Sequence, residues 1–237
     1  MKSIKNKVSI VVPVYNEEGS IEFLINEIVE VMKINEIFFE LIVINDGSQD
    51  NTSEILNYLS EKINELIVIN LRKNYGQTAA MAAGFDNANC KIIITLDGDL
   101  QNDPSDIPNL INSINEGYDL VCGWRVNRKD KLFSRRIPSK IANKLIGYVT
   151  GINLHDYGCS LKAFKNEIIK DIKLYGELHR FLPVLANIEG AKIKEIKVNH
   201  RRRKYGSSKY GIDRTFRVLM DLLTVWFMNK FLTRPMY

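Results

Sequence analysis

Two aspartates, Asp97 and Asp99, directly follow a continuous run of apolar and β-branched residues at 92–96. Such a run is typical of a strand buried in a parallel sheet, and open α/β folds bind ligands at the carboxyl ends of such strands. Side chains two residues apart leave an extended chain on one face, so the two carboxylates would repel each other without a cation between them. Hard oxygen ligands of this kind favour Mg²⁺ or Mn²⁺. The tripeptide Asp97-Gly98-Asp99 has an ordinary explanation as well, because Asp-x-Asp is common in solvated acidic turns.

The composition is that of an ordinary globular protein. The chain has 237 residues, 45% of them hydrophobic and 26% charged, which is enough for a sizeable core. The formal net charge of +5 permits an anionic partner but does not choose among nucleotide, nucleic acid and lipid headgroup. Three widely spaced cysteines fit no zinc pattern and indicate a reducing compartment. We expect neither a signal peptide nor a membrane-spanning segment.

The first 123 residues alternate between strand and helix patterns. Helical stripes separate five short apolar runs that predict strands, at 8–14, 40–45, 66–71, 92–96 and 119–123. This alternation predicts an α/β fold with a doubly wound, mostly parallel sheet. Polar or charged clusters follow four of the strands, so they should converge on one rim of the sheet. Neither a dinucleotide-binding fingerprint nor a P-loop is present.

The residues after Gly123 have a different character. Residues 125–144 hold eight Lys or Arg and one acid, and residues 200–211 form a basic loop punctuated by glycines. Residues 192–199 alternate imperfectly and predict an edge strand. Residues 215–232 combine apolar and aromatic side chains with arginines and a lysine, which suits a helix lying at a membrane interface, although a core helix has the same pattern.

Four stretches in this order and spacing resemble the family 2 glycosyltransferases: 13–17, 45–52, 97–101 and 200–210. The chain looks most like the polyprenol-phosphate glycosyltransferases of that family, relatives of dolichol-phosphate mannose synthase and of bacterial undecaprenyl-phosphate glucosyltransferases. The resemblance covers nearly the whole chain. It implies the GT-A fold, a UDP- or GDP-linked sugar donor, Mg²⁺ or Mn²⁺, and inverting transfer.

The resemblance also implies roles for individual residues. The nucleotide pocket would be lined by Pro13, Tyr15, Glu17, Asp46, Ser48 and Asp97. The metal would be bound by Asp97, Asp99 and Gln101. The donor or acceptor phosphates would be held by Arg125, Arg135, Ser139, Arg203 and Lys209. The catalytic residues would be Asp99 and Asp156, the latter at an acidic position proposed to act near the acceptor.

Several of these residues also have ordinary structural explanations. Asp46 precedes a glycine and suits a turn, and Glu17 suits the first turn of a helix. The basic run at 125–144 could be a solvated face. It holds only one acid, however, so it is not a face of alternating ion pairs, and it places Arg135 and Ser139 on one helix face. Asp156 is a base, a group that orients the sugar, or a turn acid. A phosphate acceptor is largely ionised at neutral pH, so it needs little help from a base.

Three hypotheses follow for the function. The first is transfer of one sugar to a polyprenyl phosphate at the cytoplasmic face of the cell membrane. The second keeps the GT-A fold and replaces the acceptor by a saccharide hydroxyl, which would need a true base. The third is a basic nucleic-acid-binding protein. Two features count against it: the sequence has no recognised helix or sheet motif for nucleic-acid recognition, and the acidic strand ends would repel phosphates without a metal.

We expect a GT-A domain over residues 1–211 and an amphipathic juxtamembrane helical segment over 212–237. Attachment would be peripheral for the chain as it stands, or through membrane helices if the native chain continues past Tyr237. The sequence leaves open the donor base, the sugar, the lipid length and whether the protein forms a homo-oligomer.

Overall fold

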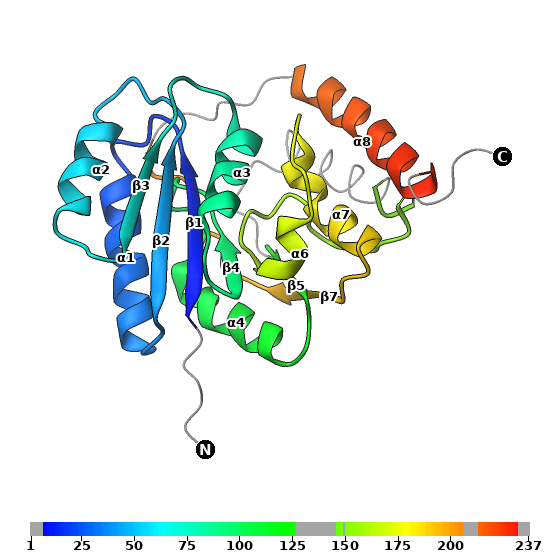
Figure 1. The fold of residues 1–237 in the computed structure, drawn as a ribbon, viewed down its shortest axis with the longest axis horizontal. Coiled ribbons are helices and arrows are strands. Elements are labelled where there is room, and N and C mark those ends of the chain that lie inside the picture. The colour runs from blue at the N-terminus through cyan, green and yellow to red at the C-terminus, as the bar shows by residue number, and fades with distance from the viewer. Residues whose placement is uncertain (1–6, 127–145, 149, 206–212, 232–237) are drawn as a thin grey trace.

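The computed structural model describes residues 7–126, 146–148, 150–205 and 213–231 (Figure 1). Its strands are β1 Val8–Val14, β2 Phe39–Asn45, β3 Leu66–Asn70, β4 Ile92–Thr95, β5 Leu120–Trp124, β6 Lys162–Lys165 and β7 Ile193–Lys197. Its α-helices are α1 Ile21–Ile34, α2 Thr52–Ser60, α3 Gln77–Asn87, α4 Ile107–Asn115, α6 Asn166–Lys170, α7 Leu182–Ile188 and α8 Asp213–Phe231. Two short 3₁₀ helices are η1 Pro104–Asp106 and η3 Leu178–Phe181.

The seven strands form one sheet in the order β3-β2-β1-β4-β6-β5-β7. Strand β6 is antiparallel to both β4 and β5, whereas the other paired strands are parallel. The doubly wound, mostly parallel sheet and the edge position of β7 are therefore confirmed. Strand β6 was not predicted, because its four residues, KAFK, carry two lysines and show no strong alternation.

Helices cover both faces of the sheet, as Figure 1 shows. Residues of α1, α2 and α4 pack with one face of the strands, and residues of α3, α6 and α7 pack with the other. The side chains of β2 are buried along its whole length, as expected for a strand sandwiched between two helical layers. Helix α1 follows its predicted stripe and buries Ile21, Leu24, Ile25, Ile28 and Met32.

A glycine lets α3 approach the sheet closely. A Cβ at Gly84 would lie 2.3 Å from Cγ1 of Val11 on β1, so any side chain there would push the helix away. This contact sets α3 against β1, and Gln77 at the start of the helix reaches Asp97 at the end of β4.

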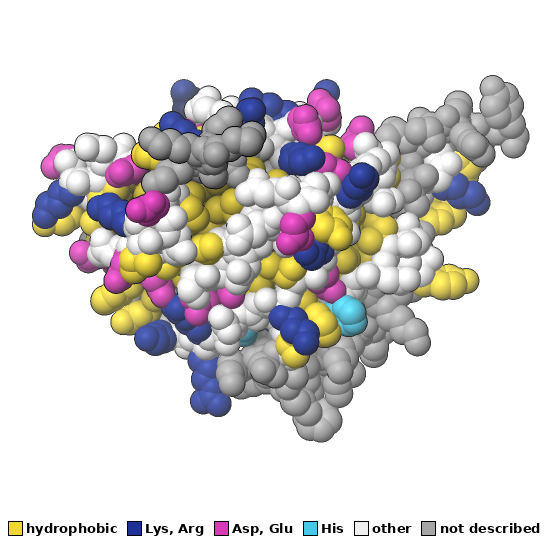
Figure 2. Space-filling model, turned by 90° about the horizontal axis from the view of Figure 1, so that it is seen from below, with side chains coloured by type: hydrophobic (Ala, Val, Ile, Leu, Met, Phe, Trp, Pro, Cys, Tyr) yellow, Lys and Arg dark blue, Asp and Glu magenta, His cyan; other side chains and the backbone are white. Residues whose placement is uncertain are grey.

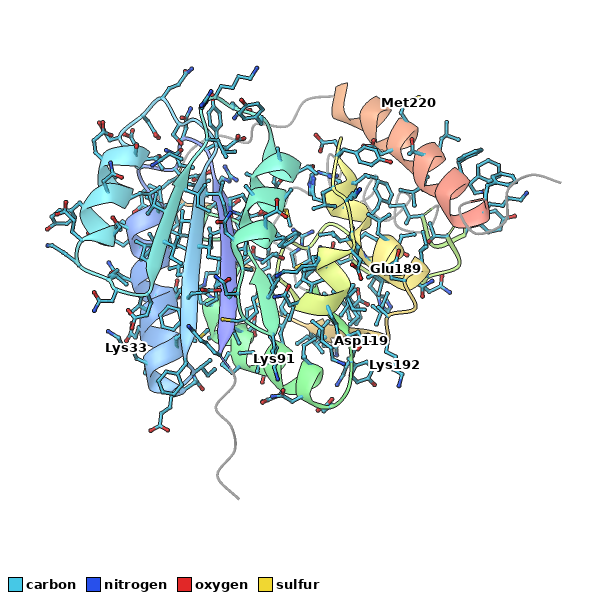
Figure 3. All side chains as sticks on the ribbon, in the orientation of Figure 1. Lys33, Lys91, Asp119, Glu189, Lys192 and Met220 are labelled. Atoms are coloured by element: carbon cyan, nitrogen blue, oxygen red, sulfur yellow. The ribbon has the colours of Figure 1, made fainter. Side chains whose placement is uncertain are left out.

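The two ends of the parallel strands differ in chemistry. The chain enters β1 at its lower end in Figure 1, and the loops that carry the predicted site residues lie at the upper, carboxyl ends. Figure 2 shows the molecule from below, where basic and acidic side chains are interspersed over the surface. Figure 3 labels Lys91, Asp119 and Lys192 near this lower end, where the Asp119 carboxylate also pairs with Lys165 Nζ at 2.6 Å.

Helix α8 lies beside α7 and buries only part of its surface. Leu222 and Val225 join the apolar cluster formed with α7, whereas Leu223 and Phe227 are more than half exposed. Among the described residues, no helix has both the length and the apolar character needed to cross a bilayer.

The buried carboxylate of Glu40 at the amino-terminal edge gives a first prediction. Burial opposes its ionisation, but donation from Ser9 Oγ and from the Asn89 backbone outweighs this and holds the pKa of Glu40 below its ordinary value. Ionised Glu40 therefore contributes stability that is complete above the unfolded pKa of about 4.5 and is lost as pH falls through the lower folded pKa. We expect Glu40→Gln to cost about 1–3 kcal/mol of unfolding free energy at neutral pH.

The measurement is urea unfolding of the wild type and the variant between about pH 7 and pH 3. The deficit of Glu40→Gln should shrink as the pH falls, because protonation removes the same interaction from the wild type. Glu61→Gln, at an exposed residue after α2, is the matched control. A deficit that stays constant with pH would contradict the assignment of this pKa shift.

Candidate functional site

The loops that follow β1 and β2 are joined by side-chain to backbone hydrogen bonds. The Asn16 N–H donates to Ser48 Oγ at 2.9 Å, and the Glu17 N–H donates to Thr52 Oγ1 at 2.9 Å. Asn16 adopts a left-handed φ of 52°, and its Oδ1 accepts from the Gln49 N–H at 2.7 Å. The sequence signals for nucleotide binding thus belong to one continuous surface at the carboxyl ends of two neighbouring strands.

Asp46 shapes the loop that leads into α3. Its two carboxylate oxygens accept from the backbone N–H groups of Tyr75 and Gly76, at 2.8 and 2.9 Å. The next residue, Gly47, has φ 69° and comes so close to Lys73 that a Cβ would lie 2.5 Å from its carbonyl carbon. Asp46 therefore has a structural role, and the remaining lone pairs of its carboxylate leave room for the predicted contact with a base.

Asp97 and Asp99 lie where β4 ends, with Asp99 buried and Asp97 half-buried. Removal from water and the neighbouring Asp99 carboxylate both raise the pKa of Asp97. Gln77 at the start of α3 donates Nε2 to Asp97 Oδ1 at 2.8 Å. Asp99 accepts from the Gln101 backbone at 3.0 Å and forms an ion pair with Arg203. The two carboxylates are therefore near enough for the charge of Asp99 to act on Asp97.

The donor set suits a hard divalent cation that also binds a substrate. The described residues contain no cluster of three or more His, Cys, Asp and Glu side chains able to hold a metal ion. Two carboxylates and the nearby amide of Gln101 would leave the other positions to phosphate oxygens and water, which is the usual arrangement for Mg²⁺. The residues present therefore fit a metal bound together with a diphosphate.

Residues 199–205 form an extended strap over this site. Alternate residues of the strap are anchored to the neighbouring elements: Asn199 to Asp106, Arg201 to Glu27 and Asp103, Arg203 to Asp99, and Tyr205 by ring stacking to Phe23. Arg201 is bidentate to Glu27 on α1, with N–O distances of 2.9 and 2.6 Å. The strap thus fixes where Arg203 meets Asp99.

This anchoring gives a second prediction, for Glu27→Ala. The Glu27–Arg201 pair is half-exposed, so its loss should weaken strap docking by up to about 1 kcal/mol. We expect faster tryptic cleavage within the basic strap and an up to about fivefold weaker affinity for UDP or GDP with Mn²⁺. Glu30→Ala, at an exposed residue of the same helix, serves as the control. Equal cleavage rates in the two variants would show that this pair does not hold the strap.

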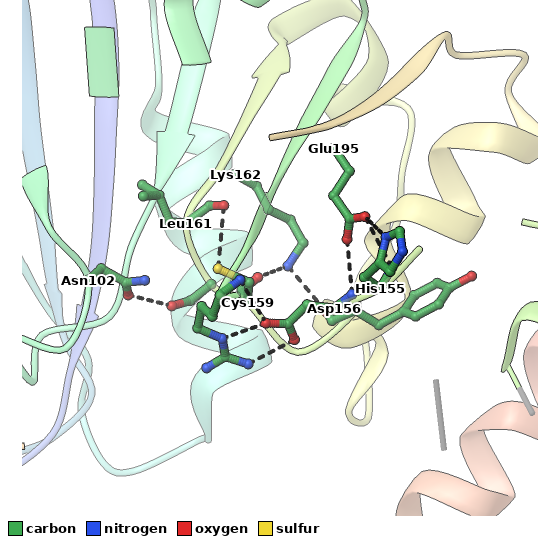
Figure 4. A network of polar contacts seen from close by, with 10 residues as sticks. Asn102, His155, Asp156, Cys159, Leu161, Lys162 and Glu195 are labelled. Atoms are coloured by element: carbon green, nitrogen blue, oxygen red, sulfur yellow. Dashed lines mark hydrogen bonds and ion pairs between the residues drawn. The ribbon is translucent and has the colours of Figure 1, made fainter. Parts of the chain in front are cut away.

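A second polar network surrounds Asp156, beyond the end of β5 (Figure 4). Arg125 donates Nε to Asp156 Oδ2 at 2.6 Å and Nη2 to Oδ1 at 2.9 Å. Glu195 on β7 accepts from the backbone N–H groups of Asp156 and His155, at 2.9 and 3.1 Å. The ring of His155 stacks on Trp124 with the centroids 4.0 Å apart. Asp156 is only 2% exposed, and both of its carboxylate oxygens accept from Arg125.

The structure joins most of the predicted residues on one rim. Pro13 is the penultimate residue of β1, and the loops after β1, β2 and β4 carry Tyr15, Glu17, Asp46, Ser48, Asp97, Asp99 and Gln101. Arg203 reaches this group through the strap, and Arg125 lies near enough for its charge to act on Asp97. Arg135, Ser139 and Lys209 lie outside the described residues.

Three contributors to this geometry were missed from the sequence. Gln77, Lys162 and Glu195 contact site residues that are 20 or more positions away or the turn that carries them. Lys162 left one signal, which is a lone cation between Leu161 and Ala163-Phe164 in an otherwise apolar stretch. Glu195 lies between Lys194 and Ile196 in the imperfectly alternating stretch and left no such signal.

The amino-acid sequence is similar to those of known glycosyltransferases. The family described as "Glycosyl transferase family 2" matches residues 9–173. The dodecaprenyl-phosphate galacturonate synthase of Rhizobium johnstonii is 48% identical over 233 residues, which span 97% of this chain and 69% of that protein. The undecaprenyl-phosphate 4-deoxy-4-formamido-L-arabinose transferase of Photorhabdus laumondii is 43% identical over 219 residues, which span 92% of this chain and 67% of that protein.

A solved structure matches the fold. Glucosyl-3-phosphoglycerate synthase from Mycobacterium tuberculosis, in complex with Mn²⁺, uridine diphosphate and phosphoglyceric acid, superposes with a TM-score of 0.71 at 18% identity. The match covers 94% of this chain and 78% of that one. At this identity the similarity shows the fold alone, and it confirms the predicted GT-A architecture.

Proposed function

Because the chain belongs to glycosyl transferase family 2, we propose that it transfers one sugar from a UDP- or GDP-sugar to a polyprenyl phosphate. The observation that carries the proposal is the identity of 41–48% to transferases named for dodecaprenyl and undecaprenyl phosphate. That identity extends over more than nine-tenths of the chain.

The donor side of the site would be built from the loops after β1, β2 and β4. Tyr15, Glu17 and Ser48 would line the nucleoside pocket, with the Asp46 carboxylate facing the base. Asp97, Asp99 and Gln101 would hold Mg²⁺ or Mn²⁺ against the diphosphate. The ion would offset the negative charge that the diphosphate gains as it leaves.

Two arginines would position the phosphates that surround the reacting bond. Arg125 presents a guanidinium already oriented by Asp156, and a fork of this kind matches a phosphate bidentately. Arg203 is paired with Asp99, so its release to a phosphate would accompany the arrival of the metal. The acceptor phosphate oxygen would then attack the anomeric carbon in line and invert its configuration. Arg135, Ser139 and Lys209 stay predictions for the same phosphates.

Asp156 would orient Arg125 rather than remove a proton. Both of its oxygens accept from Arg125, and the pair is almost fully buried. A phosphate acceptor is already ionised, so positioning can supply much of the rate without a base. A saccharide hydroxyl acceptor is the second candidate. It would require Asp156 to be free to take up a proton from that hydroxyl.

Helix α8 would attach the enzyme to the cytoplasmic face of the membrane. Its exposed side includes Met220, Leu223, Trp226 and Phe227, and Lys230 Nζ lies 5.3 Å from the Trp226 ring centroid. Apolar and aromatic residues edged by cations suit the boundary between headgroups and acyl chains. Flotation with anionic lipid vesicles tests this, and Leu223→Glu combined with Phe227→Glu should abolish binding. Retained binding by that variant would exclude α8 as the attachment surface.

The function is tested by a transfer assay with defined substrates. Thermal unfolding with UDP, GDP and their common sugars, with and without Mn²⁺, first identifies the base, because a ligand at a hundredfold excess over its Kd adds about 2.7 kcal/mol of stability. The matching nucleotide sugar is then incubated with undecaprenyl phosphate or with a saccharide, and mass spectrometry identifies the product. A glycosyl phospholipid is the expected result. Glycosylation of the saccharide alone would overturn the lipid acceptor.

A further inference from the structure

A buried lysine contacts the turn that carries Asp156. Lys162 on β6 is 4% exposed, and its Nζ donates to the backbone carbonyls of Tyr157 and Cys159. Among the residues that the structure describes, no carboxylate lies within ion-pair distance of this ammonium. Figure 4 shows Lys162 reaching toward the turn that carries Asp156.

Burying a lysine without a partner charge lowers the stability of the fold. Moving an ammonium out of water costs several kcal/mol after relaxation, and two carbonyl acceptors without a partner charge recover only part of that. A methionine of similar length would fill the same apolar position in the strand without this cost. The arrangement therefore needs a compensating benefit from the charge or from the turn that it holds.

The turn at residues 155–160 connects the two charged parts of the site. At one end Asp156 binds Arg125, and at the other the Ser160 hydroxyl donates to Asn102 Oδ1 at 2.8 Å. The Ser160 side chain also lies close enough to Asp97 to favour its ionised form, and the Ser160 carbonyl accepts from Thr95 Oγ1 at 2.7 Å. Lys162 holds the middle of this turn, between both attachments.

The charge of Lys162 acts on the same site. Lys162 and Arg125 are both cations that attract the Asp97 carboxylate. Lys162 is packed between β4 and β5, opposite Thr95 and Cys122, so its charge cannot move away when a ligand arrives. A fixed positive charge of this kind favours binding of an anionic diphosphate without reorganisation.

We propose that Lys162 is a positioning residue that fixes the 155–160 turn and thereby orients Arg125 and Asp97 for the nucleoside diphosphate. The inference rests on the proposed function, because the ligand that it positions is the diphosphate of the sugar donor. Lys162 itself contacts neither donor nor acceptor. Its effect should therefore appear in binding geometry and in kcat more than in the identity of the substrates.

The test replaces Lys162 by Met and by Arg, with Lys165→Met as the matched control. Lys165 lies on the same strand but pairs with Asp119, at the end of the strands that is farther from the site. Calorimetry measures the Kd of UDP and of GDP with Mn²⁺, and the transfer assay gives kcat and KM. We expect Lys162→Met to raise the Kd about tenfold and to lower kcat by at least that factor. Lys162→Arg should restore most of both, and Lys165→Met should resemble the wild type.

The outcomes separate this inference from the proposed function. A wild type that binds no nucleotide would contradict the function itself. A Lys162→Met protein that is folded by circular dichroism and binds like Lys165→Met would overturn the role of Lys162. If Lys162→Met does not fold, Ser160→Ala removes the hydrogen bond from the same turn to Asn102 and the hydroxyl beside Asp97, and it should weaken nucleotide binding severalfold. Unchanged binding by Ser160→Ala would equally overturn the proposal.

Discussion

Asp99→Asn should remove the Mn²⁺-dependent part of nucleotide binding and lower kcat by about a thousandfold. The substitution keeps the side-chain shape and removes the charge that a divalent ion would need beside Asp97. Calorimetric titration of UDP or GDP, with and without Mn²⁺, measures the first effect, and the transfer assay measures the second. Asp86→Asn, at an exposed residue of α3, is the matched control and should behave like the wild type.

The ion pair between Asp99 and Arg203 complicates this substitution, so a second variant is needed. Arg203→Met breaks the same pair but leaves both carboxylates in place. If Asp99 acts through the metal, Arg203→Met should keep the Mn²⁺-dependent increase in nucleotide affinity, although its overall affinity falls. Mn²⁺-dependent binding that survives in Asp99→Asn would place the metal elsewhere and overturn this assignment.

The carboxyl-edge part of the site could be predicted because its residues lie directly after apolar strand runs. Asp46 follows β2, and Asp97 and Asp99 follow β4, so periodicity alone brings them to one edge. The sequence could not show that both oxygens of Asp46 bind the backbone of Tyr75 and Gly76, since that contact spans 29 and 30 residues. A motif thus predicts position better than it predicts partners.

The network around Asp156 could not be predicted in the same way. Its existence depends on β6, which enters the sheet between β4 and β5 and so separates two strands that follow each other in the sequence. Lys162 is buried only because of that insertion, and Glu195 reaches Asp156 only because β7 pairs with β5. Both placements follow from long-range strand pairing, for which local patterns carry little information.

The pairing of Arg125 with Asp156 leads to the other prediction with a large effect. Arg125→Ala and Asp156→Asn should each lower kcat/KM by about 100-fold or more, because each disturbs the same oriented guanidinium. The double variant should be no worse than Arg125→Ala, because Asp156 then has no guanidinium to orient. This double-mutant cycle is measured as kcat/KM with undecaprenyl phosphate as the acceptor, after the folded state of every variant is checked by circular dichroism.

The cycle also decides between the two acceptor classes. A single Asp156→Asn variant does not, because the loss of a base and the loss of an anchor for Arg125 both lower the rate. If Asp156 removed a proton from a hydroxyl, its loss would be felt even without Arg125, and the two effects would multiply in the double variant. Multiplied effects would therefore overturn the orienting role, whereas a double variant equal to Arg125→Ala requires that Asp156 act through the arginine, as expected for an acceptor that arrives already ionised.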